Sequence, residues 1–117
     1  MCGVAEAVCE ALALGEKLNL PRERLLAVLS SGAADGWFLR HRGLSMLEGR
    51  FEKGFKLSLL LKDLEIVKAL ARELGMQMPV VEHAAQDYAE LVNAGEGNND
   101  ISGLIRLKKS RSGQAKD

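Results

Sequence analysis

The sequence is poor in the residues on which several classes of protein depend. Its 117 residues include two cysteines, two histidines, two prolines and only 4% aromatic residues. This composition favours helices rich in leucine, alanine and charged residues over strands. The sequence also lacks an N-terminal signal segment and any apolar run of roughly eighteen residues that could span a membrane. We therefore expect an all-α protein of the cytoplasm that does not enter a membrane.

The chain also lacks a net charge. Sixteen basic residues balance sixteen acidic ones, so no overall field attracts nucleic acid or an anionic membrane. The basic residues do gather near the C-terminus, as Arg106, Lys108, Lys109, Arg111 and Lys116. We expect residues 108–117 to form a basic flexible tail, because they lack the apolar side chains needed for docking. Binding of nucleic acid by this tail is an alternative that predicts a salt-sensitive affinity.

No arrangement of residues predicts a catalytic or metal centre. His41 and His83 lie far apart, and neither belongs to a Cys/His array with ligand spacing. The glycine-rich segment 95–97 does not follow a strand, and no serine or cysteine is spaced with a histidine for nucleophilic catalysis. Cys2 and Cys9 are two helical turns apart, about 10 Å, so we expect two reduced thiols. We predict neither catalytic residues nor metal ligands in this chain.

Apolar residues recur at helical spacing along most of the sequence. They predict helices over residues 4–18, 21–31, 33–42, 57–74 and 79–95, followed by a short helix that Asn99 or Asp100 caps. Gly43 is expected to end the third helix, and Glu6 and Glu10 to lie on the wetter side of the first. The first helix has no capping signal, so its beginning is interpreted as a cut. We predict a single helical-bundle domain over residues 1–107.

The segment 57–74 is the most informative, because it sets charged residues among leucines. Lys62 and Asp63 share one side of this helix with Leu59, Ile66 and Leu70, opposite a second apolar stripe. A helix that is apolar on two sides belongs in the middle of a bundle or at a domain boundary, where unpaired charges are costly. We therefore expect a ligand or partner to meet Lys62 and Asp63. The alternative is that both reach solvent or pair with neighbouring charges.

Several blocks of the sequence together carry a family resemblance. They are Ala5-Glu6-Ala7 through Leu14, Val28-Leu29 with Gly32, Ala34 and Trp37, Met46 to Phe51, Gly54-Phe55 leading to Lys62-Asp63-Leu64, Glu73-Leu74-Gly75 with Pro79, and Gly95 to Ser102. In this order and spacing they resemble the C-terminal helical domain of the β-hydroxyacid dehydrogenases, the 3-hydroxyisobutyrate dehydrogenase and tartronate semialdehyde reductase family. The resemblance covers residues 2–107 and implies the helical fold of the C-terminal domain of 6-phosphogluconate dehydrogenase-like enzymes.

The resemblance implies a part in a larger oxidoreductase. Such an enzyme joins an N-terminal Rossmann domain through a long helix to this domain, and oxidises a small 3-hydroxy acid with NAD or NADP. By position, Lys62 is similar to the family's cofactor-binding lysine, and Phe55 and Asp63 are similar to residues that line the substrate end of the cleft. The family's helical domain also carries subunit contacts, so the resemblance implies a homo-oligomer.

The sequence departs from the family in what it omits. The dinucleotide-binding fingerprint and the catalytic lysine of the interdomain helix have no counterpart here. Without them the isolated chain is expected to be inactive, because both positioning and proton transfer are missing. The preferred hypothesis is a truncated or split dehydrogenase that needs the missing Rossmann domain as its partner. The alternative is a stand-alone helical dimerisation module without catalysis.

Overall fold

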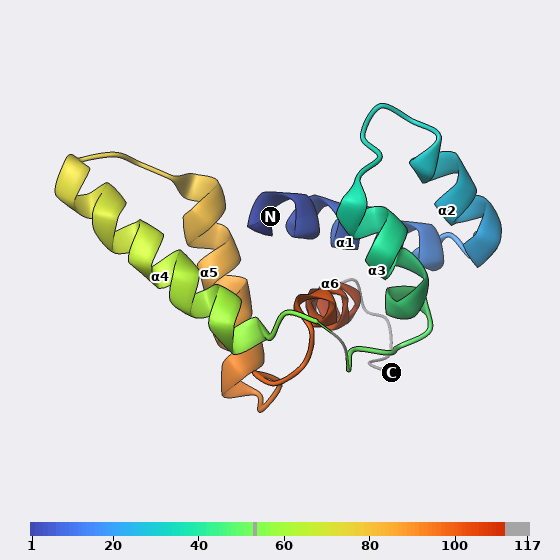
Figure 1. Cartoon of the computed structure of the whole chain (residues 1–117). Helices are drawn as coiled ribbons and strands as arrows, with labels where there is room; N and C mark the ends of the chain where they lie inside the picture. Colours follow the sequence, from blue (N-terminus) through green and yellow to red (C-terminus); the bar gives the residue numbers. More distant parts are fainter. Residues whose placement is uncertain (53, 112–117) are drawn as a thin grey trace.

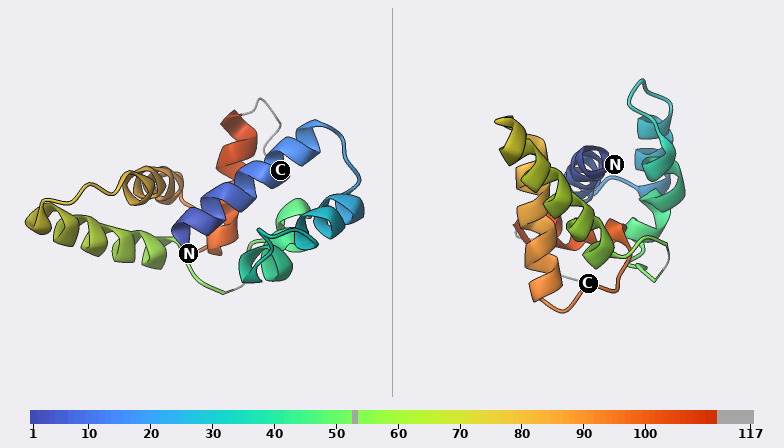
Figure 2. Two further views of the ribbon diagram at one scale, coloured as in Figure 1. Left: turned by 90° about the horizontal axis from the view of Figure 1, so that it is seen from above. Right: turned by 60° about the vertical axis from the view of Figure 1, so that its left-hand side comes forward.

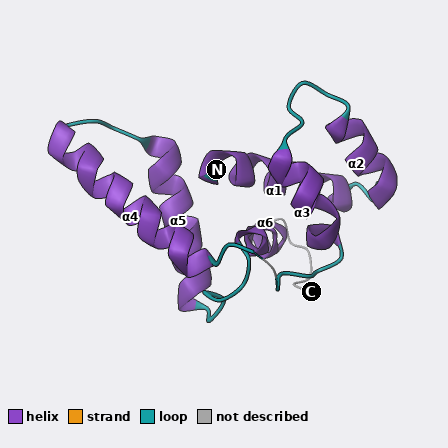
Figure 3. Ribbon diagram, in the orientation of Figure 1, coloured by secondary structure: helices purple, strands orange, loops and turns teal. Residues whose placement is uncertain are grey.

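A computed structural model describes residues 1–52 and 54–111, and within these residues it contains α-helices and one 3-10 helix but no strand (Figure 3). The elements are α1 (Cys2–Lys17), α2 (Arg22–Ser30), α3 (Trp37–Leu47), α4 (Leu57–Leu74), α5 (Pro79–Asn93), η1 (Ile101–Gly103) and α6 (Leu104–Arg111). The predicted all-α fold class is confirmed.

The helices form two outer pairs around a central crossing. Helix α1 runs through the middle and packs on α6, which crosses below it in the view of Figure 1. Helices α4 and α5 form an antiparallel hairpin on one side, and α2 and α3 pack together on the other (Figure 1). The result is an elongated domain with principal extents of 46 × 33 × 26 Å.

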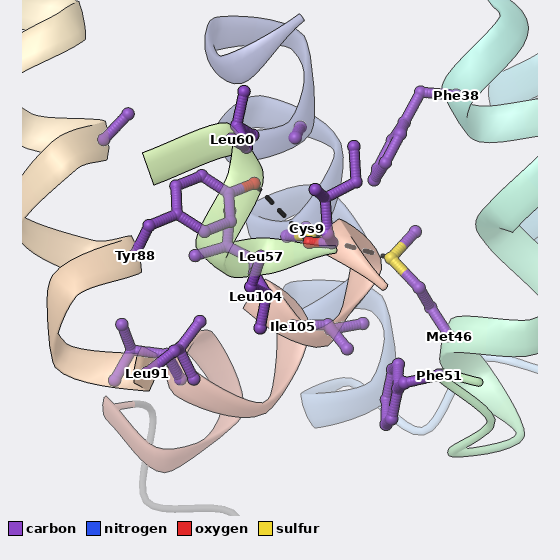
Figure 4. Close-up of a cluster of buried hydrophobic side chains, with 14 of the residues drawn as sticks. Cys9, Phe38, Met46, Phe51, Leu57, Leu60, Tyr88, Leu91, Leu104 and Ile105 are labelled. Carbon is purple, nitrogen blue, oxygen red and sulfur yellow. Dashed lines mark hydrogen bonds between the residues drawn. The ribbon is translucent and has the colours of Figure 1, made fainter. Parts of the chain in front are cut away.

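The core lies where α1, α3, α4, α5 and α6 meet (Figure 4). Its largest fully buried side chains include Tyr88, Phe38, Leu12, Met46 and Leu57.

The polar groups of Tyr88 and Cys9 have partners inside the core. The Tyr88 hydroxyl donates a hydrogen bond to the Ile101 carbonyl at 3.5 Å, and the Cys9 thiol lies 3.6 Å from the Met46 sulfur. Burial raises the pKa of both the Tyr88 hydroxyl and the Cys9 thiol, so both stay protonated. Cys2 and Cys9 are free thiols, as predicted.

Several helix ends agree with the sequence signals. Gly75 closes α4 in the left-handed conformation at φ 67°, and Pro79 occupies the first turn of α5. The Asp100 side chain caps η1 by accepting a hydrogen bond from the Ser102 amide at 3.0 Å. The sequence is sufficient to predict these helix ends, because each capping residue acts on backbone groups only a few residues away.

The prediction for the third helix is wrong at both ends. Helix α3 starts at Trp37 rather than at Ala33, after Gly36 in an extended conformation. It then continues through Gly43 to Leu47. A Cβ at Gly43 would lie 2.7 Å from Leu26 Cδ2, so this glycine permits α2 and α3 to approach closely instead of ending the helix.

The predicted tail from residue 108 is also wrong for its first part. Helix α6 continues to Arg111, and Lys108 is buried with only 6% of its surface exposed. Residues 108–111 dock through the charged side chains of Lys108 and Arg111, as described below, whereas the apolar residues of α6 that enter the core come before them. Residues 112–117, the rest of the predicted tail, lie outside the described residues. No helix in the described part of the chain is both long and apolar enough to cross a membrane.

Candidate functional site

Helix α4 places Lys62 and Asp63 on its solvent side. Its inner face buries Leu57, Leu60, Leu64 and Ala71, in agreement with the predicted inner stripe. Its outer face is open, since Leu59, Ile66 and Leu70 are 50%, 59% and 54% exposed. Helix α4 therefore does not lie in the middle of the bundle. The alternative stated above, in which both charges reach solvent, agrees with this exposure, and the domain boundary stays a prediction.

Lys62 and Asp63 are exposed and have no ion-pair partner among residues 1–52 and 54–111. The neighbouring Glu65, which could have paired with Lys62, lies instead 3.4 Å from Lys68. Thus no group in the described chain meets these two charges, contrary to what an internal bundle position would require. Their side chains are free to interact with something outside this chain.

Phe55 lies two residues before α4, on a loop that Asp100 holds in place. The buried Asp100 carboxylate accepts a hydrogen bond from the Phe55 amide at 3.0 Å and one from Arg42 Nε at 3.0 Å. The Phe55 carbonyl in turn accepts a hydrogen bond from the Ile101 amide at 2.8 Å. Gly54 has φ 85°, and a Cβ there would collide with Arg42 and Asp100. Phe55 is therefore set on a fixed loop, partly buried against the core.

The N-terminus of α4 is covered by the segment 97–100. The Leu57 amide donates to the Asn99 carbonyl at 2.9 Å, and the Ser58 amide donates to the Gly97 carbonyl at 3.0 Å. These bonds satisfy backbone donors that a helix start leaves unpaired. The loop that carries Phe55 and the first turn of α4 are thus held as one unit. Lys62 and Asp63 project from α4 one turn further along.

A second group of charges lies where α1, α5 and α6 meet; three of its members are buried and the other two, Glu10 and Arg111, are exposed at its edge. We call Glu6, Glu10, Asp87, Lys108 and Arg111 the Lys108 cluster. The Lys108 ammonium lies 2.5 Å from Glu6, 3.0 Å from Glu10 and 3.1 Å from Asp87, and its side chain is only 5% exposed. Arg111 lies 2.7 Å from the other Asp87 oxygen. These contacts dock α6 onto α1 and α5.

The cluster holds its charges in a fixed pattern. Burial favours the neutral form of Asp87, but hydrogen bonds from Arg111, Glu6 and Lys108 outweigh it and lower the pKa of Asp87 to about 2. Burial raises the pKa of Glu6, and contact with Asp87 raises it further. Burial favours neutral Lys108 as well, yet its three carboxylate partners raise its pKa. An ammonium held this firmly is a structural ion, unsuited to giving or taking a proton near neutral pH.

Two carboxylates of this cluster and the adjacent His83 together have the composition of a metal site. Ligand atoms of Glu6, His83 and Asp87 lie within 4.8 Å of one another. The Lys108 ammonium contacts both carboxylates of this group, and His83 Nε2 lies 3.4 Å from Asp87. Lys108 therefore supplies the positive charge that a metal ion would bring.

Sequence reasoning missed this cluster and placed two of its members wrongly. Glu6 was expected on the wet side of its helix but is 8% exposed, and Lys108 was assigned to the tail. A signal was present: Lys108 follows Ile101, Leu104 and Ile105 at helical spacing, and Asp87 lies between Ala84, Tyr88 and Leu91 on one face. Charged residues at such buried positions of three helices indicate that they pair with one another.

Comparisons with known proteins show the family and the fold that this chain shares. The pattern of the family described as "NAD-binding of NADP-dependent 3-hydroxyisobutyrate dehydrogenase" matches residues 2–108. The chain is 36% identical to an uncharacterized oxidoreductase from Shewanella frigidimarina, covering 96% of this chain and 39% of that protein. It is 28% identical to L-threonate dehydrogenase from Haemophilus influenzae, covering 86% of this chain and 34% of that enzyme.

A solved structure has the same arrangement of helices. The 3-hydroxyisobutyrate dehydrogenase from Salmonella typhimurium superposes with a TM-score of 0.82 at 26% identity, covering 91% of this chain and 38% of that one. The chain thus spans less than two fifths of the length of each of these relatives. The match over residues 2–108, with the helical fold, establishes that this chain belongs to the NAD-binding domain family of the 3-hydroxyisobutyrate dehydrogenases.

Proposed function

We propose that this chain forms one wall of the substrate and cofactor cleft of an NAD(P)-dependent 3-hydroxyacid dehydrogenase of the cytoplasm. Lys62 would contact the cofactor, and Phe55 and Asp63 would line the substrate end. The observation that carries this proposal is the open outer face of α4, where two unpaired charges project among exposed apolar side chains. Such a face fits a boundary with a second domain better than it fits open solvent.

The residues suit the groups that they would meet. An exposed lysine without a carboxylate partner can donate hydrogen bonds to phosphate or ribose oxygens of a nicotinamide dinucleotide. Asp63 can accept a hydrogen bond from a substrate hydroxyl, and Phe55 can exclude water beside it. The dinucleotide supplies the hydride acceptor or donor when bound. None of these residues is placed to transfer the proton, so we propose that the isolated chain is inactive.

The rest of the site would come from a Rossmann domain that this chain does not contain. The relatives are more than twice as long as this chain, which leaves room for such a domain, and the family name refers to a nicotinamide cofactor. Small hydroxy acids are the substrate class that the names of the relatives suggest. We also propose self-association, which the resemblance implies.

The test is to mix the chain with the N-terminal part of the Shewanella frigidimarina relative, without that protein's own helical domain. NADH and NADPH binding would be followed by fluorescence, and turnover with 3-hydroxyisobutyrate and L-threonate by absorbance. Binding and turnover that need both parts are expected. Lys62→Ala should weaken cofactor binding by about tenfold, the effect of losing one charge-assisted hydrogen bond.

Lys68→Ala is the matched control, because Lys68 lies on the same helix but pairs with Glu65. It should leave cofactor binding unchanged. A well-folded mixture that binds no dinucleotide would refute the proposal. If the chain dimerises but Lys62→Ala changes nothing in any assay, the stand-alone dimerisation module becomes the better description.

A further inference from the structure

A hollow opens where the end of α3, the loop that follows it and the segment 100–102 meet. It has a volume of about 240 Å³, which at about 30 Å³ per water molecule gives room for roughly eight waters or one small solute. Its wall includes Arg40 and Arg42 of α3, Arg50 of the loop and Ser102 of η1. We call this hollow the arginine pocket. Helix α4 contributes no described residue to it, and Figure 2 shows α3 and the α4–α5 hairpin on opposite sides of α1.

Two arginines of the pocket keep hydrogen-bond donors that have no acceptor in the described chain. Arg40 donates to Asp35, and Arg50 donates to Glu48. Neither of these carboxylates lines the pocket. A guanidinium carries five N–H donors in a planar fork, so each ion pair leaves further donors that can bind an anion.

Arg42 is the most firmly held of the three arginines. Its Nε donates to the buried Asp100 carboxylate at 3.0 Å, its Nη1 donates to the His41 carbonyl at 3.4 Å, and its guanidinium lies 5.0 Å from the centre of the Trp37 ring. Only 15% of its side chain is exposed. A guanidinium that is already ordered loses little conformational entropy when an anion binds to its remaining donors.

Ser102 supplies a donor of another kind. The residue is 1% exposed, and its hydroxyl is buried without a hydrogen-bond partner in the part of the chain that the structure describes. The amide of the same residue is satisfied, because it donates to Asp100 at 3.0 Å. A buried hydroxyl without a partner costs free energy unless a polar group in the neighbouring cavity meets it. The unpaired hydroxyl therefore indicates a polar occupant of the pocket.

The charges of the pocket favour an anion. Its lining contains three guanidiniums and two carboxylates, those of Asp100 and Glu52. The Asp100 carboxylate already accepts hydrogen bonds from one of these guanidiniums and from two backbone amides. Glu52 is exposed, so water and salt screen its charge. A carboxylate ligand offers two oxygens, whereas a phosphate group offers three or four, which suits three guanidinium forks and a hydroxyl better.

We propose that the arginine pocket binds a phosphate group, carried either by inorganic phosphate or by a small phosphate monoester. The three guanidiniums and the Ser102 hydroxyl donate hydrogen bonds to its oxygens. The inference goes beyond the proposed function, because the residues proposed to meet the cofactor and the substrate do not line this pocket. The two sites are connected through Asp100, which lines the pocket and also holds the Phe55 amide.

Isothermal titration calorimetry of the chain with sodium phosphate, at constant ionic strength, tests the proposal. Saturable binding of one phosphate per chain is expected. Arg50→Gln should weaken binding roughly tenfold, the effect of losing a charge-assisted hydrogen bond. Glu52→Gln should strengthen it about threefold, because a repelling charge is removed. Arg72→Gln is the matched control: Arg72 is exposed in the last turn of α4, across α1 from the pocket, so its loss should leave phosphate binding unchanged.

Ser102→Ala separates phosphate binding from folding. Without phosphate, this variant should keep or raise the free energy of unfolding measured in urea, because it removes a buried hydroxyl that has no partner. Its affinity for phosphate should nevertheless fall roughly tenfold. A serine that only stabilised the fold would give the reverse, a lower free energy of unfolding with an unchanged affinity, and that result would overturn the proposal.

Titrations with glycerol 3-phosphate and with acetate identify the ligand chemistry. Tighter binding of glycerol 3-phosphate than of inorganic phosphate supports a monoester, and the reverse order supports the free ion. Acetate should bind about tenfold more weakly than either. The proposal is overturned if neither phosphate compound binds saturably, if acetate binds equally well, or if Arg72→Gln weakens binding as much as Arg50→Gln. These results do not depend on NADH or NADPH, so this proposal and the proposed function can fail separately.

Discussion

Lys62 and Lys108 show how differently one residue type is used in two regions of this domain. Lys62 projects from the outer face of α4 without a partner in the described chain, whereas Lys108 is enclosed by Glu6, Glu10 and Asp87. Sequence analysis singled out Lys62 as a candidate binding residue because it lies among leucines. It assigned Lys108 to the flexible tail because that residue is followed by polar residues. An unpaired charge on a surface is available for binding, while a buried and saturated one is available only for structure.

The largest effect should come from removing the buried ammonium. Lys108→Met keeps the length of the side chain but leaves Glu6, Glu10 and Asp87 facing one another. We expect it to lower the free energy of unfolding by about 3–5 kcal/mol, as measured when one partner of a buried ion pair is lost. Urea denaturation followed by circular dichroism measures this difference. A change below about 1 kcal/mol would mean that water replaces the ammonium and that the cluster is not what docks α6.

The pH dependence of the cluster should separate two of its carboxyls. Asp87 has a folded pKa of about 2, below its ordinary value of 3.8. Its stabilising contribution is therefore complete above about pH 4 and lost as the pH falls towards 2. Asp87→Asn should cost about 2 kcal/mol at neutral pH and progressively less below pH 4.

Glu6 should behave in the opposite way, because burial and Asp87 raise its pKa above 4.5. The stability linked to its protonated form is complete below pH 4.5 and lost as the pH rises. Glu6→Gln should therefore gain stability relative to the natural chain as the pH rises from 4.5 to 7. Thermal melts at stepped pH would measure both variants. Parallel pH profiles for the two variants would contradict the assignment of opposite shifts.

The smallest effects should come from the exposed pair. Lys62→Met and Asp63→Asn should each change the free energy of unfolding by less than about 0.5 kcal/mol, because neither charge has a partner in the described chain. The same urea experiment measures both, with Lys108→Met as the reference. A loss as large as that of Lys108→Met would show that Lys62 stabilises the fold, and the contrast between the two lysines would disappear.

Helix positions and fold class were largely predictable, because apolar periodicity and caps act over a few residues. Leu57–Leu74 and its end at Gly75 are examples. Gly43 was wrongly expected to end a helix. It instead leaves space for Leu26 of another helix, and the residues next to Gly43 in the sequence do not indicate that contact. The Lys108 cluster was missed for the same reason, since its members come from α1, α5 and α6. The positions of Lys62, Asp63 and Phe55 followed from local pattern, but their roles depend on groups outside the chain.

The bond between Asp100 and the Phe55 amide joins residues 45 positions apart. During synthesis the α4–α5 hairpin can emerge from the ribosome complete, yet the loop that carries Phe55 has no anchor until the segment 97–102 has followed. The proposed substrate wall is therefore among the last parts of the domain to acquire its shape. A nascent or proteolysed chain that stops before Asp100 would contain every proposed ligand-binding residue and still lack the geometry to use them.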